Sequence, residues 1–186
     1  IALPPLGTPT TELPSVTRAV MERLDALVDP AITRRIFANC LRQLDREAFM
    51  PEREKYREAG SLDAYLDRKR EEFVAQLEQI AHEGGLFFSQ PITATVVDYV
   101  RSHPEIGRGI RVGNVLYETK IPYLTAEYLV ATDPGMQRYH YCHCPWAKES
   151  LRAGETPVPA TFCQCSAGFH KLRWEVIFDQ PLRAEI

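Results

Sequence analysis

Four cysteines arranged as two Cys-x-Cys pairs constrain the fold of this chain more than any other feature of its sequence. The pairs are Cys142 with Cys144 and Cys163 with Cys165. Pro145 follows the first pair and favours the first turn of a helix, because its missing N–H would be unpaired there. Ser166 follows the second pair and is predicted to cap a helix that has an apolar face. Each pair is therefore predicted to precede a helix N-terminus.

The predicted position of these cysteines has a chemical consequence. Unpaired backbone N–H groups and the helix dipole favour negative charge at a helix N-terminus, so a thiol there has a lowered pKa and more thiolate character. Residues 136–144 are predicted to form a strand, in which residues two apart share a face. His140, Cys142 and Cys144 would then lie on one side. We expect both pairs to meet in one thiol-rich site between His140 and His170.

The first functional interpretation of this site is a metal centre. Four thiolates suit tetrahedral zinc or an iron–sulfur cluster, and clustered soft thiolates usually serve a metal. Zinc is the first expectation and an iron–sulfur cluster the second. The expected ligands are Cys142, Cys144, Cys163 and Cys165, with His140, His143 and His170 as alternates.

Three other interpretations of the same cysteines stay open. In a thiol enzyme, a hydrolase of a small heterocyclic or amide-like substrate, an activated cysteine would be the nucleophile. Its candidate residues are Cys144 or Cys165 as nucleophile, His143, His140 or His170 as base, and Glu149 and Glu175 as groups that orient the base. A redox or ligand sensor would instead change shape when its thiols oxidise. The cysteines can also be small buried hydrophobes or form disulfides, and burial on an apolar helical face is the expectation for Cys40.

The hydrophobic periodicity predicts an α+β fold. Residues 1–14 form an irregular arm, and residues 15–85 form helical hairpins, among them helices over residues 15–28, 32–44, 51–60 and 61–83. Residues 86–186 are expected to form an α+β Cys-rich ligand-binding domain, separate from the helices or continuous with them. Its mostly antiparallel sheet, with helices packed on it, would include a last strand over residues 182–186. With 186 residues, 45% of them hydrophobic, the chain can bury one core.

Charge and cysteine usage exclude several classes of protein. The net charge is −3, and Lys and Arg at residues 42–83 are interleaved with Asp and Glu, so no basic stripe for nucleic acid is expected. No apolar run is long enough to cross a bilayer, so no membrane partner is expected. An odd count of five cysteines fits a reducing cytoplasm better than a secreted disulfide scaffold. The expected partner is a small-molecule ligand, and the oligomeric state is not predicted.

Two segments around the cysteine pairs resemble known domains. The run RYHYCHCPWAKES at residues 138–150 and the run FCQCSAGFHK at residues 162–171 resemble an uncharacterised bacterial family of Cys-rich domains. Residues 163–186 are also loosely similar to the 4-vinyl reductase ligand-binding domain and to the 2-amino-thiazoline-4-carboxylate hydrolases. The resemblance implies an antiparallel sheet with helices and a small-molecule pocket, with the four paired cysteines near that pocket. Such relatives usually carry one more cysteine in a final strand, before which this sequence ends.

Overall fold

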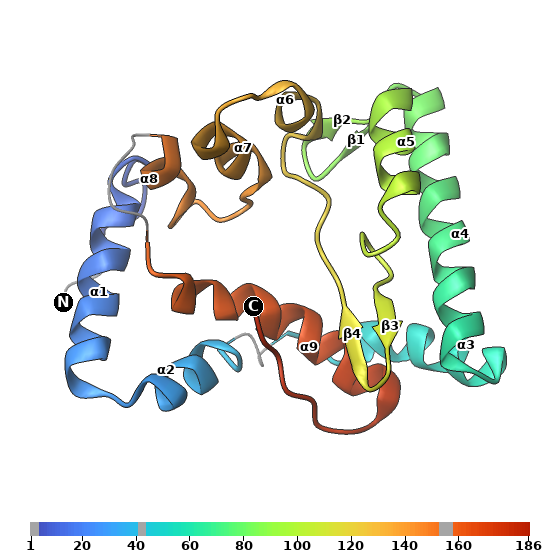
Figure 1. Cartoon of the computed structure of the whole chain (residues 1–186), viewed down its shortest axis with the longest axis horizontal. Coiled ribbons are helices and arrows are strands. Elements are labelled where there is room, and N and C mark those ends of the chain that lie inside the picture. Colours follow the sequence, from blue (N-terminus) through green and yellow to red (C-terminus); the bar gives the residue numbers. More distant parts are fainter. Residues whose placement is uncertain (1–3, 41–43, 153–157) are drawn as a thin grey trace. The chain divides into compact units, whose positions relative to one another are not determined.

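The computed structural model describes residues 4–40, 44–152 and 158–186. These residues form nine α-helices and two antiparallel hairpins, which confirms the predicted α+β class (Figure 1). The α-helices are α1 (Leu13–Leu27), α2 (Pro30–Phe37), α3 (Met50–Ala59), α4 (Leu62–His82), α5 (Ala94–Ser102), α6 (Thr125–Val130), α7 (Pro134–Tyr141), α8 (Lys148–Arg152) and α9 (Gln164–Phe178). The 3-10 helices are η1 (Glu47–Phe49) and η2 (Ala160–Cys163). The hairpins pair β1 (Leu86–Phe87) with β2 (Gln90–Pro91) and β3 (Ile110–Val112) with β4 (Val115–Tyr117).

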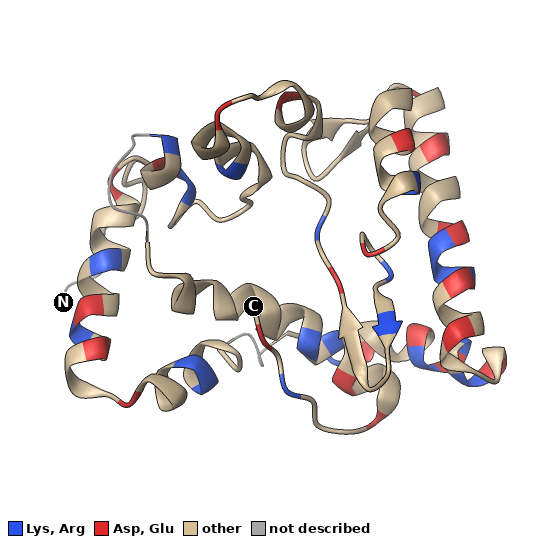
Figure 2. Cartoon of the chain, in the orientation of Figure 1, with Lys and Arg blue, Asp and Glu red and all other residues tan. Residues whose placement is uncertain are grey.

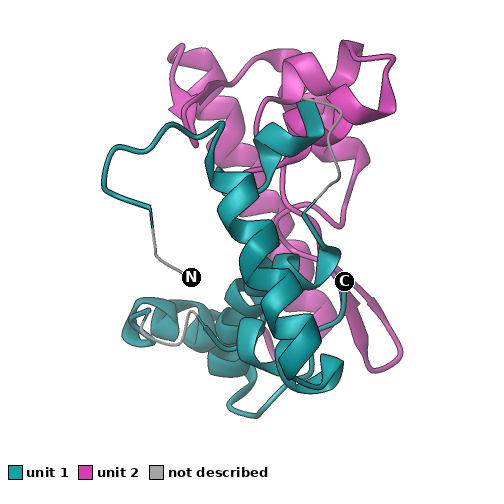
Figure 3. Cartoon of the chain, turned by 90° about the vertical axis from the view of Figure 1, so that its left-hand side faces the viewer, with its two compact units in different colours: residues 1–58, 144–186 teal, residues 59–143 magenta. Residues whose placement is uncertain are grey.

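The chain forms two compact units, which Figure 3 distinguishes by colour. The first unit comprises residues 1–58 and 144–186, and the second comprises residues 59–143. The boundary at residues 143 and 144 therefore divides the first cysteine pair. The sequence instead predicts domain boundaries after residues 14 and 85, where the hydrophobic pattern along the chain changes. These boundaries stay predictions.

Side-chain caps begin several of the predicted helices. The Asp29 carboxylate accepts hydrogen bonds from the N–H groups of Ala31 and Ile32 at the start of α2. The Ser61 hydroxyl accepts from the Ala64 N–H at the start of α4, as the sequence predicts. The helix α1 begins two residues before the predicted start, so it takes up the end of the expected arm.

The second predicted helix is shorter than expected. The helix α2 ends at Phe37, and Asn39 and Cys40 follow in tight turns whose N–H groups bond to carbonyls three residues back. The side-chain amide of Asn39 also donates to the Arg35 carbonyl, which competes with a further helical turn. The prediction that Cys40 is buried on a helical face is therefore wrong, because its side chain is exposed. The predicted continuation through Leu41 lies outside the residues that the structure describes.

The strand predicted over residues 136–144 is wrong, because residues 134–141 form the helix α7. Asp133 accepts a hydrogen bond from the Met136 N–H, with an Oδ1 to N distance of 2.8 Å. Pro134 occupies the first helical turn, where a missing N–H costs nothing. The Asp-Pro-Gly sequence that predicts a turn is thus a helix start. The alternating pattern that suggested a shared face for His140 and Cys142 is interrupted at the helix end.

The C-terminal prediction also needs correction, because residues 182–186 form no strand. Asp179 ends α9 with a positive φ of 55°, which turns the chain away from the helix axis. The Leu182 N–H then donates to a Glu175 carboxylate oxygen at 3.1 Å. This backbone donor is taken by a side chain of α9, so the alternation of apolar residues at the end of the chain does not produce strand pairing.

The core of the second unit lies between α4, α5 and the segments that follow them. Its buried side chains are Leu77, Ile92, Val96, Val97, Val100, Ile106 and Ile121. Phe73 and Phe87 pack against this cluster with their rings edge to face. Gln90 is also buried, and its side chain joins β2 to the start of α6 by donating to the Pro122 carbonyl and accepting from the Thr125 N–H. The helix α5 is capped by the Thr93 hydroxyl, which accepts from the Val96 N–H.

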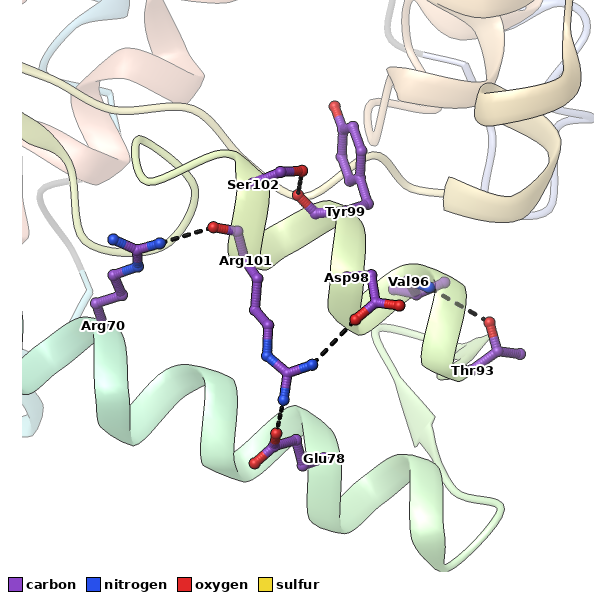
Figure 4. A network of polar contacts seen from close by, with 8 residues as sticks. All are labelled: Arg70, Glu78, Thr93, Val96, Asp98, Tyr99, Arg101 and Ser102. Carbon is purple, nitrogen blue, oxygen red and sulfur yellow. Dashed lines mark hydrogen bonds and ion pairs between the residues drawn. The ribbon is translucent and has the colours of Figure 1, made fainter.

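Ion pairs connect the outer faces of α4 and α5. Arg101 on α5 pairs with Glu78 on α4 and with Asp98 one turn earlier, and Arg70 donates to the Arg101 carbonyl (Figure 4). Figure 2 shows Lys, Arg, Asp and Glu interleaved along α4, as the sequence predicts for a solvated helix face. Arg108, which follows α5 in the chain, also pairs with α4, at Asp67.

The helices α2 and α9 of the first unit approach each other closely at a glycine. A Cβ built on Gly168 would lie 2.5 Å from the Ala38 carbonyl oxygen. One turn further along α9, Lys171 donates to the Asn39 side-chain oxygen at 2.8 Å. The rings of Phe37 and Phe162 meet edge to face at 5.5 Å between centroids.

None of the helices in the described ranges combines the length and apolarity that a bilayer crossing requires.

Candidate functional site

The first cysteine pair occupies the segment between α7 and α8. Cys142 is the C-cap of α7 in an extended conformation, and its N–H donates to the Arg138 carbonyl at 3.0 Å. The Cys144 carbonyl accepts from the N–H groups of Ala147 and Lys148, so Cys144 begins the turn that leads into α8. The pair precedes a helix as predicted, but Pro145 lies three residues before that helix, which begins at Lys148. Both thiols are half-buried.

The turn after Cys144 is attached to α1 of the same unit. The Thr17 hydroxyl, which is buried, donates to the Trp146 carbonyl at 3.0 Å. Ala147 and Ser150 are buried as well. The backbone that carries Cys144 is thus held by a polar contact and by packing.

The second cysteine pair lies where η2 passes into α9. Cys163 is the N-cap residue of α9 and is exposed, whereas Cys165 lies in the first turn and is half-buried. The predicted cap at Ser166 is wrong, because the helix has already begun at Gln164. The Gln164 N–H donates to the Thr161 carbonyl, so η2 supplies a backbone acceptor at the place where a free helix end was expected.

The histidine between the first two cysteines is held by three groups of the second unit. His143 Nε2 donates to the Ile121 carbonyl oxygen at 2.8 Å. Its ring meets the ring of Tyr123 at 5.2 Å and that of Phe88 at 5.9 Å, both edge to face. A ring nitrogen that donates to a carbonyl is not the one that accepts a proton, so any action of His143 as a base would use Nδ1.

Backbone hydrogen bonds fix the residues on either side of these contacts. The N–H of Leu124 donates to the His140 carbonyl at 2.9 Å, and that of Tyr123 donates to the Tyr141 carbonyl at 3.3 Å. Residues 121–124 and 140–143 therefore run beside each other, joined by two backbone bonds and one side-chain bond. The position of Cys142 is tied to this pair of segments.

The two remaining candidate histidines lie in helices of different units. His140 is in the last turn of α7, and its Nδ1 is buried without a hydrogen-bond partner. His170 lies in α9, where its ring meets that of Phe169 edge to face.

The two units divide the predicted ligands. Cys144, Cys163, Cys165 and His170 belong to the first unit, and His140, Cys142 and His143 belong to the second. Across residues 4–40, 44–152 and 158–186, no three His, Cys, Asp or Glu side chains are grouped in a way that could hold a metal ion. The convergence of all four thiols stays a prediction.

The two carboxylates expected to orient a base make ion pairs with neighbouring helical residues. Glu175 is buried and lies 3.5 Å from the Lys171 ammonium, in addition to its bond with the Leu182 N–H. Glu149 pairs with Arg152 at 2.9 Å. Glu175 therefore acts in the packing of α9 and the C-terminal segment.

Sequence reasoning missed two features of the second unit. Burial raises the pKa values of Tyr99 and Tyr141, and interaction with Tyr128 raises that of Tyr99 further, so these phenols stay protonated at neutral pH.

Phe88 and Ser89 form the turn between β1 and β2 with positive φ angles of 48° and 66°. Glycine or asparagine at these two positions would signal such a turn, and the chain has phenylalanine and serine there.

No family model matches the chain, and the searches of curated proteins and of solved structures give no match. The resemblance of the two cysteine segments to known domains therefore stays a prediction.

Proposed function

We propose that the chain binds a metal ion through its paired cysteine thiolates, with zinc as the first candidate and an iron–sulfur cluster as the second. Cys144, Cys163 and Cys165 would supply three ligands. Cys142, two residues before Cys144 in the chain, would supply the fourth. The observation that carries the proposal is the placement of three of these thiols in one compact unit, each beside the start of a helical segment.

Donor chemistry supports a soft metal. Each of the five cysteines carries a thiol in the structure. Four sulfur ligands complete a tetrahedral zinc site, and a structural zinc site holds the segments that provide its ligands. The turn that follows Cys144 is anchored by the bond from the Thr17 hydroxyl to the Trp146 carbonyl, and Cys163 and Cys165 lie in a continuous helical run. Two anchored segments would lose less conformational freedom on binding a metal than mobile loops would.

The same proposal gives the protein a cellular setting and a partner class. Thiols held for a metal persist in a reducing compartment, so we assign the protein to the cytoplasm. The aromatic side chains around His143, namely Phe88 and Tyr123, would suit a small-molecule ligand near the cysteine segment.

Titration of the reduced chain with cobalt(II) tests the metal proposal. Thiolate ligation gives an intense sulfur-to-metal charge-transfer band, and one equivalent of cobalt should saturate it. Cys163→Ser and Cys165→Ser should weaken binding by more than the roughly 10–100-fold that loss of a supporting contact costs. Cys40→Ser is the matched control and should bind as the unaltered chain does. Absence of the band, or an equal effect of Cys40→Ser, would count against the proposal.

A thiol-based sensor is the second candidate function, and the exposure of Cys163 favours it. An exposed thiol is accessible to oxidants, and a nearby cysteine such as Cys165 can form a disulfide with the oxidised sulfur if local geometry allows. Reversible loss of two thiols on mild oxidation, with no cobalt band in the reduced chain, would select this function. A thiol-dependent hydrolase ranks third. Glu175, one of the carboxylates expected to orient its base, is already engaged by Lys171 and by the Leu182 N–H.

A further inference from the structure

The His143 side chain makes a hydrogen bond and two ring contacts within the second unit. Its Nε2–H donates to the Ile121 carbonyl, and its ring meets the rings of Tyr123 and Phe88 edge to face. Donation from Nε2 is available both to the neutral Nε2–H tautomer and to the protonated ring. The backbone bonds from residues 123 and 124 to residues 141 and 140 hold the same two segments together.

A fixed side chain fixes the backbone that carries it. Cys142 and Cys144 are joined to His143 by peptide bonds, and Cys142 is extended. The bond to Ile121 is made by the residue between the two cysteines, so it restricts the backbone that carries both thiols. The Ile121 carbonyl occupies Nε2 of His143, so this nitrogen is not open to a metal ion or to an incoming proton.

We infer that His143 is a positioning residue for Cys142 and Cys144, which acts by anchoring the segment between them and not as a metal ligand or a base. The part of this inference that concerns metal binding rests on the proposed function. The effect of His143 on the two thiols is expected in the metal-free chain as well. Loss of the imidazole releases the segment, and the side-chain amide of glutamine can replace the Nε2–H donor to Ile121.

The test compares the unaltered chain with His143→Ala and His143→Gln, all reduced and free of metal. Alkylation rates by iodoacetamide are followed at each cysteine by peptide mass spectrometry. His143→Ala should raise the rates at Cys142 and Cys144 several-fold and leave those at Cys40 and Cys163 unchanged. His143→Gln should restore most of the protection. Equal rates at Cys142 and Cys144 in all three proteins would overturn the inference, as would a uniform rise at every cysteine.

Cobalt titration of the same proteins separates this inference from the metal proposal. His143→Ala should bind cobalt about 10–100-fold more weakly, as expected for a residue that supports ligands, while the charge-transfer band per bound metal stays the same. X-ray absorption should then show the same number of nitrogen and sulfur ligands in the unaltered chain and in His143→Gln. Loss of a nitrogen ligand would make His143 a ligand and overturn the inference. If no protein binds cobalt but the alkylation rates change as expected, the metal proposal fails and the positioning role stands.

Discussion

The close approach of α2 and α9 depends on one residue, Gly168, which has no Cβ to occupy the space beside Ala38. An alanine there would place its Cβ 2.5 Å from the Ala38 carbonyl oxygen and 2.8 Å from the carbonyl carbon. Backbone atoms cannot rotate away, so the two helices must move apart. Sequence reasoning places Gly168 in a helix but gives no sign of this contact, because the partner lies 130 residues earlier in the chain.

We predict that Gly168→Ala destabilises the chain. Alanine gains about 1 kcal/mol over glycine in a helix, whereas overpacking costs about 1–3 kcal/mol, so the net change should be a loss of stability. Urea denaturation followed by circular dichroism measures it. Ser166→Ala on the same helix is the control and should change stability little. A more stable Gly168→Ala chain would show that the helices separate without cost.

Two half-buried phenols make the free energy of unfolding depend on pH in the alkaline range. Tyr99 and Tyr141 have pKa values raised above the ordinary 10.0, chiefly by burial. Below pH 10 both the folded and the unfolded chains hold these protons, so the phenols cause no pH dependence. Above about pH 10 the unfolded chain loses protons that the folded chain keeps, and the free energy of unfolding falls as the pH rises. Urea denaturation between neutral pH and pH of about 11 should show this loss, and the Tyr99→Phe variant should show a smaller one.

At the scale of elements, the helix α7 decides where the first cysteine pair begins. The sequence predicts a strand there, in which Tyr139, Tyr141 and His143 would face one side, and the other side would carry His140, Cys142 and Cys144. The cap by Asp133 and the position of Pro134 outweigh that pattern, and the strand register assigned to the cysteines is lost. The helix α9 shows the opposite case, since its apolar positions predict a helix correctly, and only its first residue differs.

We predict that Asp133→Ala lowers stability by about 0.5–2 kcal/mol, the usual cost of removing an N-cap side chain. Asp133→Asn keeps an oxygen acceptor for the Met136 N–H and should lose much less. Urea denaturation measures both variants. Amide hydrogen exchange of residues 136–141 should rise in Asp133→Ala, because the end of the helix opens more often. Unchanged exchange there would show that the cap does not hold α7.

At the scale of the whole molecule, the sequence predicts the fold class and most helices, because periodic apolar residues and caps are local signals. The helices α3 and α4 follow their predicted positions for this reason. The grouping of residues 1–58 with 144–186 is a long-range property that no local pattern encodes. The candidate site divides in the same way. A helix follows the first cysteine pair as predicted, and the second pair lies at the start of α9. The hydrogen bond from His143 to Ile121, in contrast, depends on a carbonyl 22 residues away in the sequence.

The metal content of the protein tests the central claim most directly. The full chain should be purified with reductant and without oxygen, and its zinc and iron should be measured by elemental analysis against protein concentration. We predict about one zinc per chain, as four thiolates hold one tetrahedral ion, and little metal in a chain that carries both Cys163→Ser and Cys165→Ser. A correctly folded chain that contains neither zinc nor iron, and takes up neither when they are supplied, would contradict the account.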